Sequence, residues 1–234
     1  TPIEAPSPNH GPRRDGARPD LVVLHFTAMA TAEAALDRLR DPASEVSAHW
    51  LIAEDGRIFR LVDETRRAWH AGAGAWGGAA DVNSRSIGIE LANPGPRDGF
   101  PPYPEPQMAV LERLLDAISA RWGIPPARII GHSDMAPGRK TDPGPKFDWR
   151  RLARGGRAVW VEAAPHARSD PAAFRTAAAR AGYVAPGGDW DAVLGAFRLR
   201  FRPGTAGPLD ARDVALAERL AADHPCVDAV PLPT

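Results

Sequence analysis

The stretch from Leu21 to Thr27, LVVLHFT, decides how the main part of this chain folds. Its four aliphatic residues follow Pro19-Asp20, and a short apolar run bounded by turn residues predicts a buried β-strand. The strand ends at His25. We therefore expect this imidazole at the mouth of a sheet.

A second short apolar run predicts another strand, and it also ends at a histidine. Residues 128–131, RIIG, lead directly into His132. Pro137-Gly138 and Pro143-Gly144-Pro145 follow, and they predict a defined loop instead of a helix or a central strand. Two strands can bring the two imidazoles together, and the loop carries Asp142 as a third candidate ligand.

The three side chains match the ligand number of a catalytic zinc site. Such sites usually take three His or carboxylate ligands and keep a fourth position for water. His25, His132 and Asp142 supply that number. Taken singly, His25 also fits a core histidine bonded to backbone, and Asp142 fits the start of an Asp-Pro turn. The residues alone leave both interpretations open.

Residues Ser86 to Leu91, SIGIEL, predict a strand with two distinct faces. By the period of two, Ile87, Ile89 and Leu91 form a core face, and Glu90 lies on the other face beside Ser86 and Gly88. The small neighbours leave room for a ligand, although an ordinary solvated strand face explains the pattern equally well. Lys140 precedes Asp142 by two residues, so it is either close to a metal-bound substrate or a surface lysine.

Five motifs occur in an order and spacing that resemble one enzyme family. They are VLHFT (Val23–Thr27), VSAHWLIAEDGRI (Val46–Ile58), RAWHAG (Arg67–Gly72), NSRSIGIEL (Asn83–Leu91) and GHSDMAPGRKTDPGPKFDW (Gly131–Trp149). Together they are similar to the type 2 N-acetylmuramoyl-L-alanine amidases, which are zinc enzymes that also resemble peptidoglycan recognition proteins. The resemblance covers roughly the first two thirds of the chain.

This resemblance implies a fold, a cofactor and a reaction. The fold class would be α/β (α+β), a mixed central β-sheet flanked by helices. One Zn2+ would be held by His25, His132 and Asp142, with Glu90 and Lys140 as the catalytic pair. Glu90 would take a proton from the attacking water and pass it to the leaving amine. The positive charge of Lys140 would stabilise the developing oxyanion. The scissile bond would be the amide between the lactyl group of N-acetylmuramic acid, or its anhydro form, and L-alanine in peptidoglycan or muropeptides.

Four further residues are candidates for substrate binding. The alternation in Val46–Ile52 places His49 on the face opposite Trp50, where it either lines the cleft or hydrogen-bonds to a residue of the metal site. His70 lies in a Trp-His-Ala-Gly turn at the expected cleft rim, and this region borders the substrate in the resembled family. His49, His70, Trp76 and Asn83 are therefore our substrate-binding candidates, with the hydrogen-bonding role favoured for His49 and core packing as the alternative for Trp76.

The helices are predicted by their apolar periodicity and their caps. The clearest one runs from Pro106 to Trp122, is stopped by Gly123 and covers the sheet; an earlier one runs from about Thr31 to Arg40. Three short helices are expected near the C-terminus: one opened by Ser169-Asp170-Pro171 and stopped by Gly182, one beginning near Asp189-Trp190, and one from about Leu209 or Ala211 to Asp223.

These helices suggest a division of the chain. We expect a zinc amidase catalytic domain at residues 1–155, a linker at 156–168 and a small three-helix domain at 169–234. The last part resembles the peptidoglycan-binding modules appended to some amidases of this family. A structural cap on the catalytic domain would have the same helical periodicity, so both interpretations stay open.

Composition excludes several other classes of protein. The 234 residues include 29 basic and 29 acidic side chains, so the formal net charge is zero and nothing favours nucleic acid as a partner. No apolar run approaches the ~18 residues that a membrane span needs. Cys226 is the single cysteine, which excludes a disulfide framework. We expect a monomer in the cytoplasm that recycles anhydro-muropeptides, with a periplasmic or outer-membrane location acting on intact wall as the alternative.

The main competing hypothesis is a binding protein. Peptidoglycan recognition proteins of this kind often lack a zinc ligand and bind without cleaving. Here all three ligand positions and both catalytic positions carry competent side chains. The sequence therefore favours catalysis.

Overall fold

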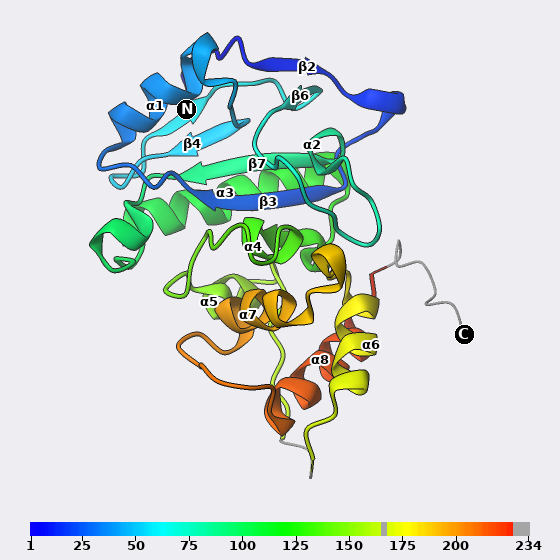
Figure 1. Cartoon of the computed structure of the whole chain (residues 1–234). Helices are drawn as coiled ribbons and strands as arrows, with labels where there is room; N and C mark the ends of the chain where they lie inside the picture. The colour runs from blue at the N-terminus through cyan, green and yellow to red at the C-terminus, as the bar shows by residue number, and fades with distance from the viewer. Residues whose placement is uncertain (165–167, 227–234) are drawn as a thin grey trace.

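A computed structural model describes residues 1–164 and 168–226 of the chain, and a six-stranded mixed sheet forms its centre (Figure 1). The strand order is β1-β5-β4-β7-β3-β8. These strands are β1 (Ile3–Glu4), β3 (Leu21–Phe26), β4 (Trp50–Ile52), β5 (Ile58–Arg60), β7 (Ser86–Leu91) and β8 (Ile129–Gly131). A separate two-stranded sheet pairs β2 (His10–Pro12) with β6 (Arg66–Ala68).

The register of the central strands positions the site. β3 pairs in parallel with both β7 and β8, and only the β4–β5 pair of this sheet is antiparallel. Within these pairs His25 lies opposite Glu90, and Leu24 lies opposite Gly131. Because neighbouring strands are about 4.8 Å apart, the register brings Glu90 beside His25 and starts the His132 segment on the other side of β3.

Helix α3 (Glu105–Trp122) covers one face of the sheet, and in Figure 1 it lies behind the strands. Its buried residues pack with the even positions of β3 and the odd positions of β7, as the period of two predicts. Gly123 ends the helix with a positive φ of 70°, the conformation in which glycine is favoured. The predicted mixed sheet flanked by helices is confirmed.

The opposite face of the sheet carries the candidate site and is covered in two parts. Helix α1 (Ala32–Arg40) packs over the β4–β5 side, and the Thr31 hydroxyl caps it by accepting from the Ala34 N–H at 3.1 Å. The β3–β8 side is covered by the short helix α4 (His132–Met135) and by the C-terminal helices (Figure 1). The cleft lies on this face of the sheet.

The remaining helices follow the sequence patterns closely. They are α2 (Val82–Arg85), α5 (Trp149–Arg154), α6 (Pro171–Ala181), α7 (Trp190–Phe201) and α8 (Ala211–Asp223). Short 3-10 turns occur at Arg14–Gly16, Pro42–Ser44, Gly95–Asp98, Pro126–Arg128 and Pro186–Gly188. In residues 1–164 and 168–226, no helix is both long and apolar enough to cross a bilayer.

The C-terminal helices share one hydrophobic core with the sheet. Leu21, Val23 and Ile130 of the sheet belong to the same buried cluster as Phe174 of α6 and Phe197 of α7. Part of the expected linker is packed as well, since Ala158, Val159 and Val161 are buried. Residues 165–167 of that linker and 227–234 of the expected helical domain lie outside the described residues. The division into two domains stays a prediction.

Candidate metal and catalytic centre

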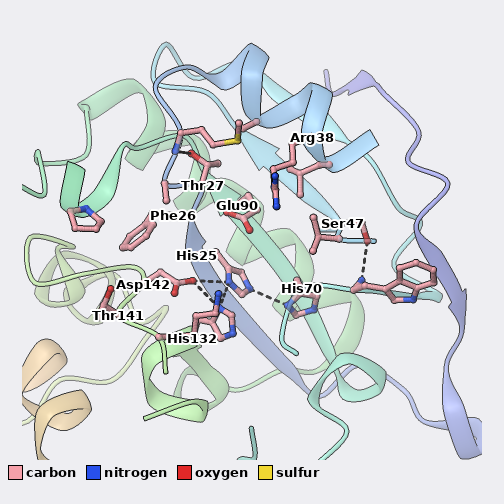
Figure 2. A pocket seen from close by; sticks show the side chains of 18 of the residues that line it. His25, Phe26, Thr27, Arg38, Ser47, His70, Glu90, His132, Thr141 and Asp142 are labelled. Atoms are coloured by element: carbon pink, nitrogen blue, oxygen red, sulfur yellow. Dashed lines mark hydrogen bonds and ion pairs between the residues drawn. The ribbon is translucent and has the colours of Figure 1, made fainter. Parts of the chain in front are cut away.

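Three side chains meet where β3 and β8 end. The Nδ1 atoms of His25 and His132 are 2.9 Å apart, and Asp142 Oδ2 lies 2.9 Å from the first and 3.0 Å from the second (Figure 2). All three residues are buried. The structure therefore brings together the three ligands that the sequence predicts, and together they could hold a metal ion.

The triangle has the size that one zinc ion requires. Zinc bonds of 2.0–2.1 Å at tetrahedral angles place neighbouring ligand atoms roughly 3.3 Å apart, and the three separations here are within a few tenths of an ångström of that value. Two imidazoles and one carboxylate also form a ligand set that zinc accepts in catalytic sites. The residues fit a single zinc ion.

The far nitrogen of each ligand imidazole has a hydrogen-bond partner. His132 Nε2 lies 2.8 Å from the Ala71 carbonyl oxygen, and His25 Nε2 lies 3.0 Å from His70 Nδ1. A carbonyl oxygen can only accept, so His132 carries its proton on Nε2 and has a lone pair on Nδ1 for a metal. Such outer contacts orient metal ligands and raise their basicity.

Burial favours the neutral form of the ligand His25. It lowers the pKa of His25 to about 4, and the nearby His132 ring adds to this effect. A neutral imidazole is the protonation state in which His25 can bind a metal.

Glu90 lies beside this triangle with an unused oxygen. Its Oε2 atom is buried and has no hydrogen-bond partner within the described ranges. Burial raises the pKa of Glu90 well above its ordinary value, and the nearby Asp142 carboxylate raises it further. A carboxyl group with a raised pKa and a free oxygen is suited to proton transfer. Figure 2 shows Glu90 directed into the same cleft as His25 and Asp142.

The triangle and Glu90 line a cleft of about 340 Å³. Lys140 and His70 also line it, as the sequence predicts for residues near a substrate. The cleft further contains residues that sequence reasoning missed, and they include Met29, Arg38 and Arg139. Arg38 comes from α1, whose periodicity identifies only the buried stripe, so no local signal marks its exposed face as part of a site.

Arg139 directly precedes Lys140, and its side chain bonds a neighbouring segment of backbone. Its guanidinium donates to the carbonyl oxygens of Ala71, at 2.7 Å, and of Ala73. The 139–142 loop is thus tied to the 71–73 segment on the other side of His132. The sequence Gly138-Arg139-Lys140 shows that a cation is present here. It does not show which groups Arg139 bonds, because carbonyl acceptors leave no sequence pattern.

Three of the four predicted substrate contacts do not line the cleft, and the prediction of direct contact is not supported for them. His49 is fully buried: its Nδ1 accepts from the Gly88 N–H at 2.9 Å, and its Nε2 donates to the Arg66 carbonyl at 3.0 Å. Asn83 accepts with Oδ1 from the N–H groups of His70 and Ala71.

Trp76 is the third of these residues. Its ring is buried against Tyr183, with ring centroids 5.2 Å apart in an edge-on arrangement. Trp76 therefore packs in the core, as the alternative interpretation of the sequence proposed. Tyr183 belongs to the C-terminal part of the chain, so this contact could not be read from the sequence around Trp76.

Comparison with known proteins identifies the family of this chain. The family model described as N-acetylmuramoyl-L-alanine amidase matches residues 15–145, which is more than half of the chain. The protein therefore belongs to the N-acetylmuramoyl-L-alanine amidase family, and the resemblance found in the motifs is confirmed. It is similar to Escherichia coli N-acetylmuramoyl-L-alanine amidase AmiD, with 37% identity over 227 residues, 86% of this chain and 81% of the relative.

Other relatives show how far the likeness extends. The 1,6-anhydro-N-acetylmuramyl-L-alanine amidase AmpD of Enterobacter cloacae is 35% identical over 164 residues, which cover 63% of this chain and 86% of that protein. The structure of E. coli AmiD with the substrate anhydro-N-acetylmuramic acid-L-Ala-D-gamma-Glu-L-Lys matches with a TM-score of 0.81 and 36% identity, over 90% of this chain and 91% of that one.

Pseudomonas aeruginosa AmpDh3 also has the same overall fold. Its structure matches with a TM-score of 0.76 and 32% identity, over 90% of this chain and 94% of that one. Coverage of nine tenths of this chain reaches beyond residue 168 into the C-terminal helices. The match to AmiD and AmpDh3 therefore includes the sheet and part of the C-terminal helices.

Proposed function

We propose that the protein is a zinc-dependent amidase that hydrolyses the bond between the lactyl group of N-acetylmuramic acid, or its anhydro form, and L-alanine of peptidoglycan or muropeptides. The observation that carries the proposal is the buried triangle of His25, His132 and Asp142 beside Glu90, one of whose carboxyl oxygens has no hydrogen-bond partner among the described residues. Relatives named as amidases of this bond, including one solved with an anhydro-muropeptide substrate, support it.

The proposed roles follow from the chemistry of the side chains. His25, His132 and Asp142 would hold the zinc ion, and zinc in such a site polarises a carbonyl oxygen and lowers the pKa of water to about 7. Glu90 takes the proton from the attacking water and passes it to the leaving L-alanine amine, for which its raised pKa is suited. Lys140 places a positive charge in the cleft where the oxyanion develops.

Arg38 adds a positive charge at the wall of the cleft. Its side chain is exposed, and within the described residues it has no ion-pair partner; Figure 2 shows it directed into the cleft. The tripeptide substrate of AmiD contains a γ-linked D-Glu, whose α-carboxylate is free. We propose that Arg38 pairs with such a stem-peptide carboxylate.

Product analysis tests the function directly. Purified protein would be incubated with anhydro-N-acetylmuramyl-L-Ala-D-γ-Glu-L-Lys and the products identified by mass spectrometry. We expect a tripeptide with a free L-alanine amino group and an anhydro-muramic acid with an intact lactyl carboxylate. A chelator should abolish the reaction, and added zinc should restore it. Binding of the muropeptide without any product would instead indicate a recognition protein, and cleavage within the peptide would indicate a peptidase.

A further inference from the structure

We propose that His70 is a positioning residue for the metal centre, not a substrate contact, and that Ser86 and Asn83 hold it in place. His70 would fix the proton and the ring orientation of His25. The inference rests on the proposed function, because it takes His25 as a metal ligand through Nδ1. The inference concerns His70, Ser86 and Asn83, which hold the metal ligands in place and are not ligands themselves.

The direction of each hydrogen bond can be derived from one end of a chain of contacts. Ser86 Oγ lies 2.6 Å from the Val82 carbonyl oxygen, which can only accept, so the single hydroxyl proton is used there. Ser86 Oγ must then accept from His70 Nε2, which lies 3.1 Å away. His70 therefore carries its proton on Nε2.

The same logic continues to the metal ligand. A neutral imidazole with a proton on Nε2 has a lone pair on Nδ1. His70 Nδ1 accepts from His25 Nε2–H at 3.0 Å, and this leaves the His25 Nδ1 lone pair facing His132 and Asp142. The Val82 carbonyl thus determines, through two side chains, which nitrogen of His25 can bind a metal. Both nitrogens of His70 are used, so the ring has none left for a substrate.

Asn83 supports both ligand histidines through one segment of backbone. Its Oδ1 accepts from the N–H groups of His70 and Ala71, at 3.0 and 2.9 Å. His70 contacts His25 through its ring, and the Ala71 carbonyl accepts from His132 Nε2 at 2.8 Å. One amide side chain therefore places the outer partners of both imidazole ligands.

The space for the His70 ring is provided by Gly88 of β7. A Cβ atom at this position would lie 2.5 Å from His70 Cγ, which is closer than real contacts allow. The ring therefore lies directly against the strand backbone. This explains why the small residues at 86 and 88 accompany Glu90 on the cleft face of β7: one is the acceptor for His70, and the other makes room for it.

The test compares zinc affinity in two variants of His70. Asn can place its Oδ1 near the position of the imidazole Nδ1, so His70→Asn keeps the acceptor for His25, whereas His70→Leu removes it. Loss of an outer partner typically weakens metal binding by roughly 10- to 100-fold. We expect that loss for His70→Leu in competition titrations against a chelating dye, and a loss of only a few fold for His70→Asn.

Ser86→Ala provides a second variant if His70→Leu does not fold. It should weaken zinc binding less than His70→Leu, and it should add nothing in the His70→Leu background, because both changes break the same chain of hydrogen bonds. Ser7→Ala is the matched control, since Ser7 is also buried and its hydroxyl also bonds backbone groups, but neither a ligand histidine nor the His70 segment. Imidazole nitrogen NMR of the zinc-loaded protein should show His25 protonated at Nε2, and this signal should change in Ser86→Ala.

The outcomes separate this inference from the proposed function. If the wild-type protein binds zinc and cleaves the muropeptide while His70→Leu and Ser86→Ala bind zinc equally well, the positioning role is wrong and the amidase proposal stands. Equal losses in Ser7→Ala and Ser86→Ala would also overturn the positioning role. If the wild-type protein binds no zinc, both proposals fail.

Discussion

Within the part of the chain that the structure describes, Glu90 is distinguished from the other cleft carboxylate by a side-chain oxygen that has no hydrogen-bond partner. Asp142 Oδ2, in contrast, lies 2.9 Å and 3.0 Å from the Nδ1 atoms of two imidazoles. Glu90→Gln keeps the shape of the side chain and removes its ability to take a proton. We expect kcat to fall by roughly 10²- to 10⁴-fold, the usual contribution of a general base, with zinc content unchanged in metal analysis. A variant with full kcat would exclude Glu90 from the mechanism.

Arg38 allows a prediction about substrate affinity. Exposed ion pairs contribute up to about 1 kcal/mol, so Arg38→Ala should raise KM for an anionic muropeptide about two- to fivefold and leave kcat nearly unchanged. Arg40→Ala is the control, because Arg40 lies on the same helix and is exposed but does not line the cleft. Equal KM values for the two variants would contradict a role for Arg38 in binding.

Burial of His49 should make the free energy of unfolding depend on pH. Burial lowers its pKa to about 4 from an ordinary value of 6.5, although its bond to the Arg66 carbonyl partly opposes this. The unfolded chain therefore binds a proton between these values that the folded protein does not bind. The stabilisation is complete above about pH 6.5 and is lost as the pH falls toward about 4, by up to about 3 kcal/mol.

The measurement is a difference between two proteins. Urea unfolding of the metal-free wild type and of His49→Asn would be followed from about pH 7 down to about pH 5. We expect the gap between their unfolding free energies to narrow with falling pH, because the variant lacks this titrating group. A gap that stays constant would show that His49 takes up no proton on unfolding in this range.

At the scale of elements, the sequence predicted what local patterns encode. The period of two placed Glu90 opposite the aliphatic face of β7, and capping residues located α1 and α6. It could not predict the partners of His49 or Trp76, because those come from β6, β7 and the segment after α6. The residues alone offered His25, His132 and Asp142 as candidate ligands, but only the family resemblance favoured metal binding over a core histidine and an Asp-Pro turn.

Helix α4 shows how elements support the centre. Asp134 follows His132 by two residues, is fully buried, and accepts from the Gly131 N–H, the Tyr183 hydroxyl and Arg200 Nη1 at 2.7–2.9 Å. Removing one partner of a buried ion pair typically costs 3–5 kcal/mol. Asp134→Ala should destabilise the protein by about that amount in urea unfolding. Asp116→Ala, which breaks a more exposed pair with Arg157, should cost less than about 1 kcal/mol.

At the scale of the whole molecule, the C-terminal helices complete the fold of the sheet. They bury the Leu21, Val23 and Ile130 side chains, and Arg200 of α7 reaches Asp134 next to a proposed zinc ligand. Each exposed aliphatic side chain loses about 1.5–3 kcal/mol of burial, and a domain has only about 5–15 kcal/mol of net stability. Deleting residues 169–234 should therefore lower the melting temperature sharply or prevent folding, and it should reduce zinc content.

The deletion also decides between the two interpretations of these helices. A structural cap predicts that stability, zinc content and cleavage of a small muropeptide are lost together, because one core serves all three. A recognition module predicts that the shortened protein melts as before and cleaves the small substrate, but no longer sediments with insoluble peptidoglycan. Thermal denaturation, metal analysis and co-sedimentation of the two proteins measure these outcomes. The shared core favours the cap, and an unchanged melting temperature would contradict it.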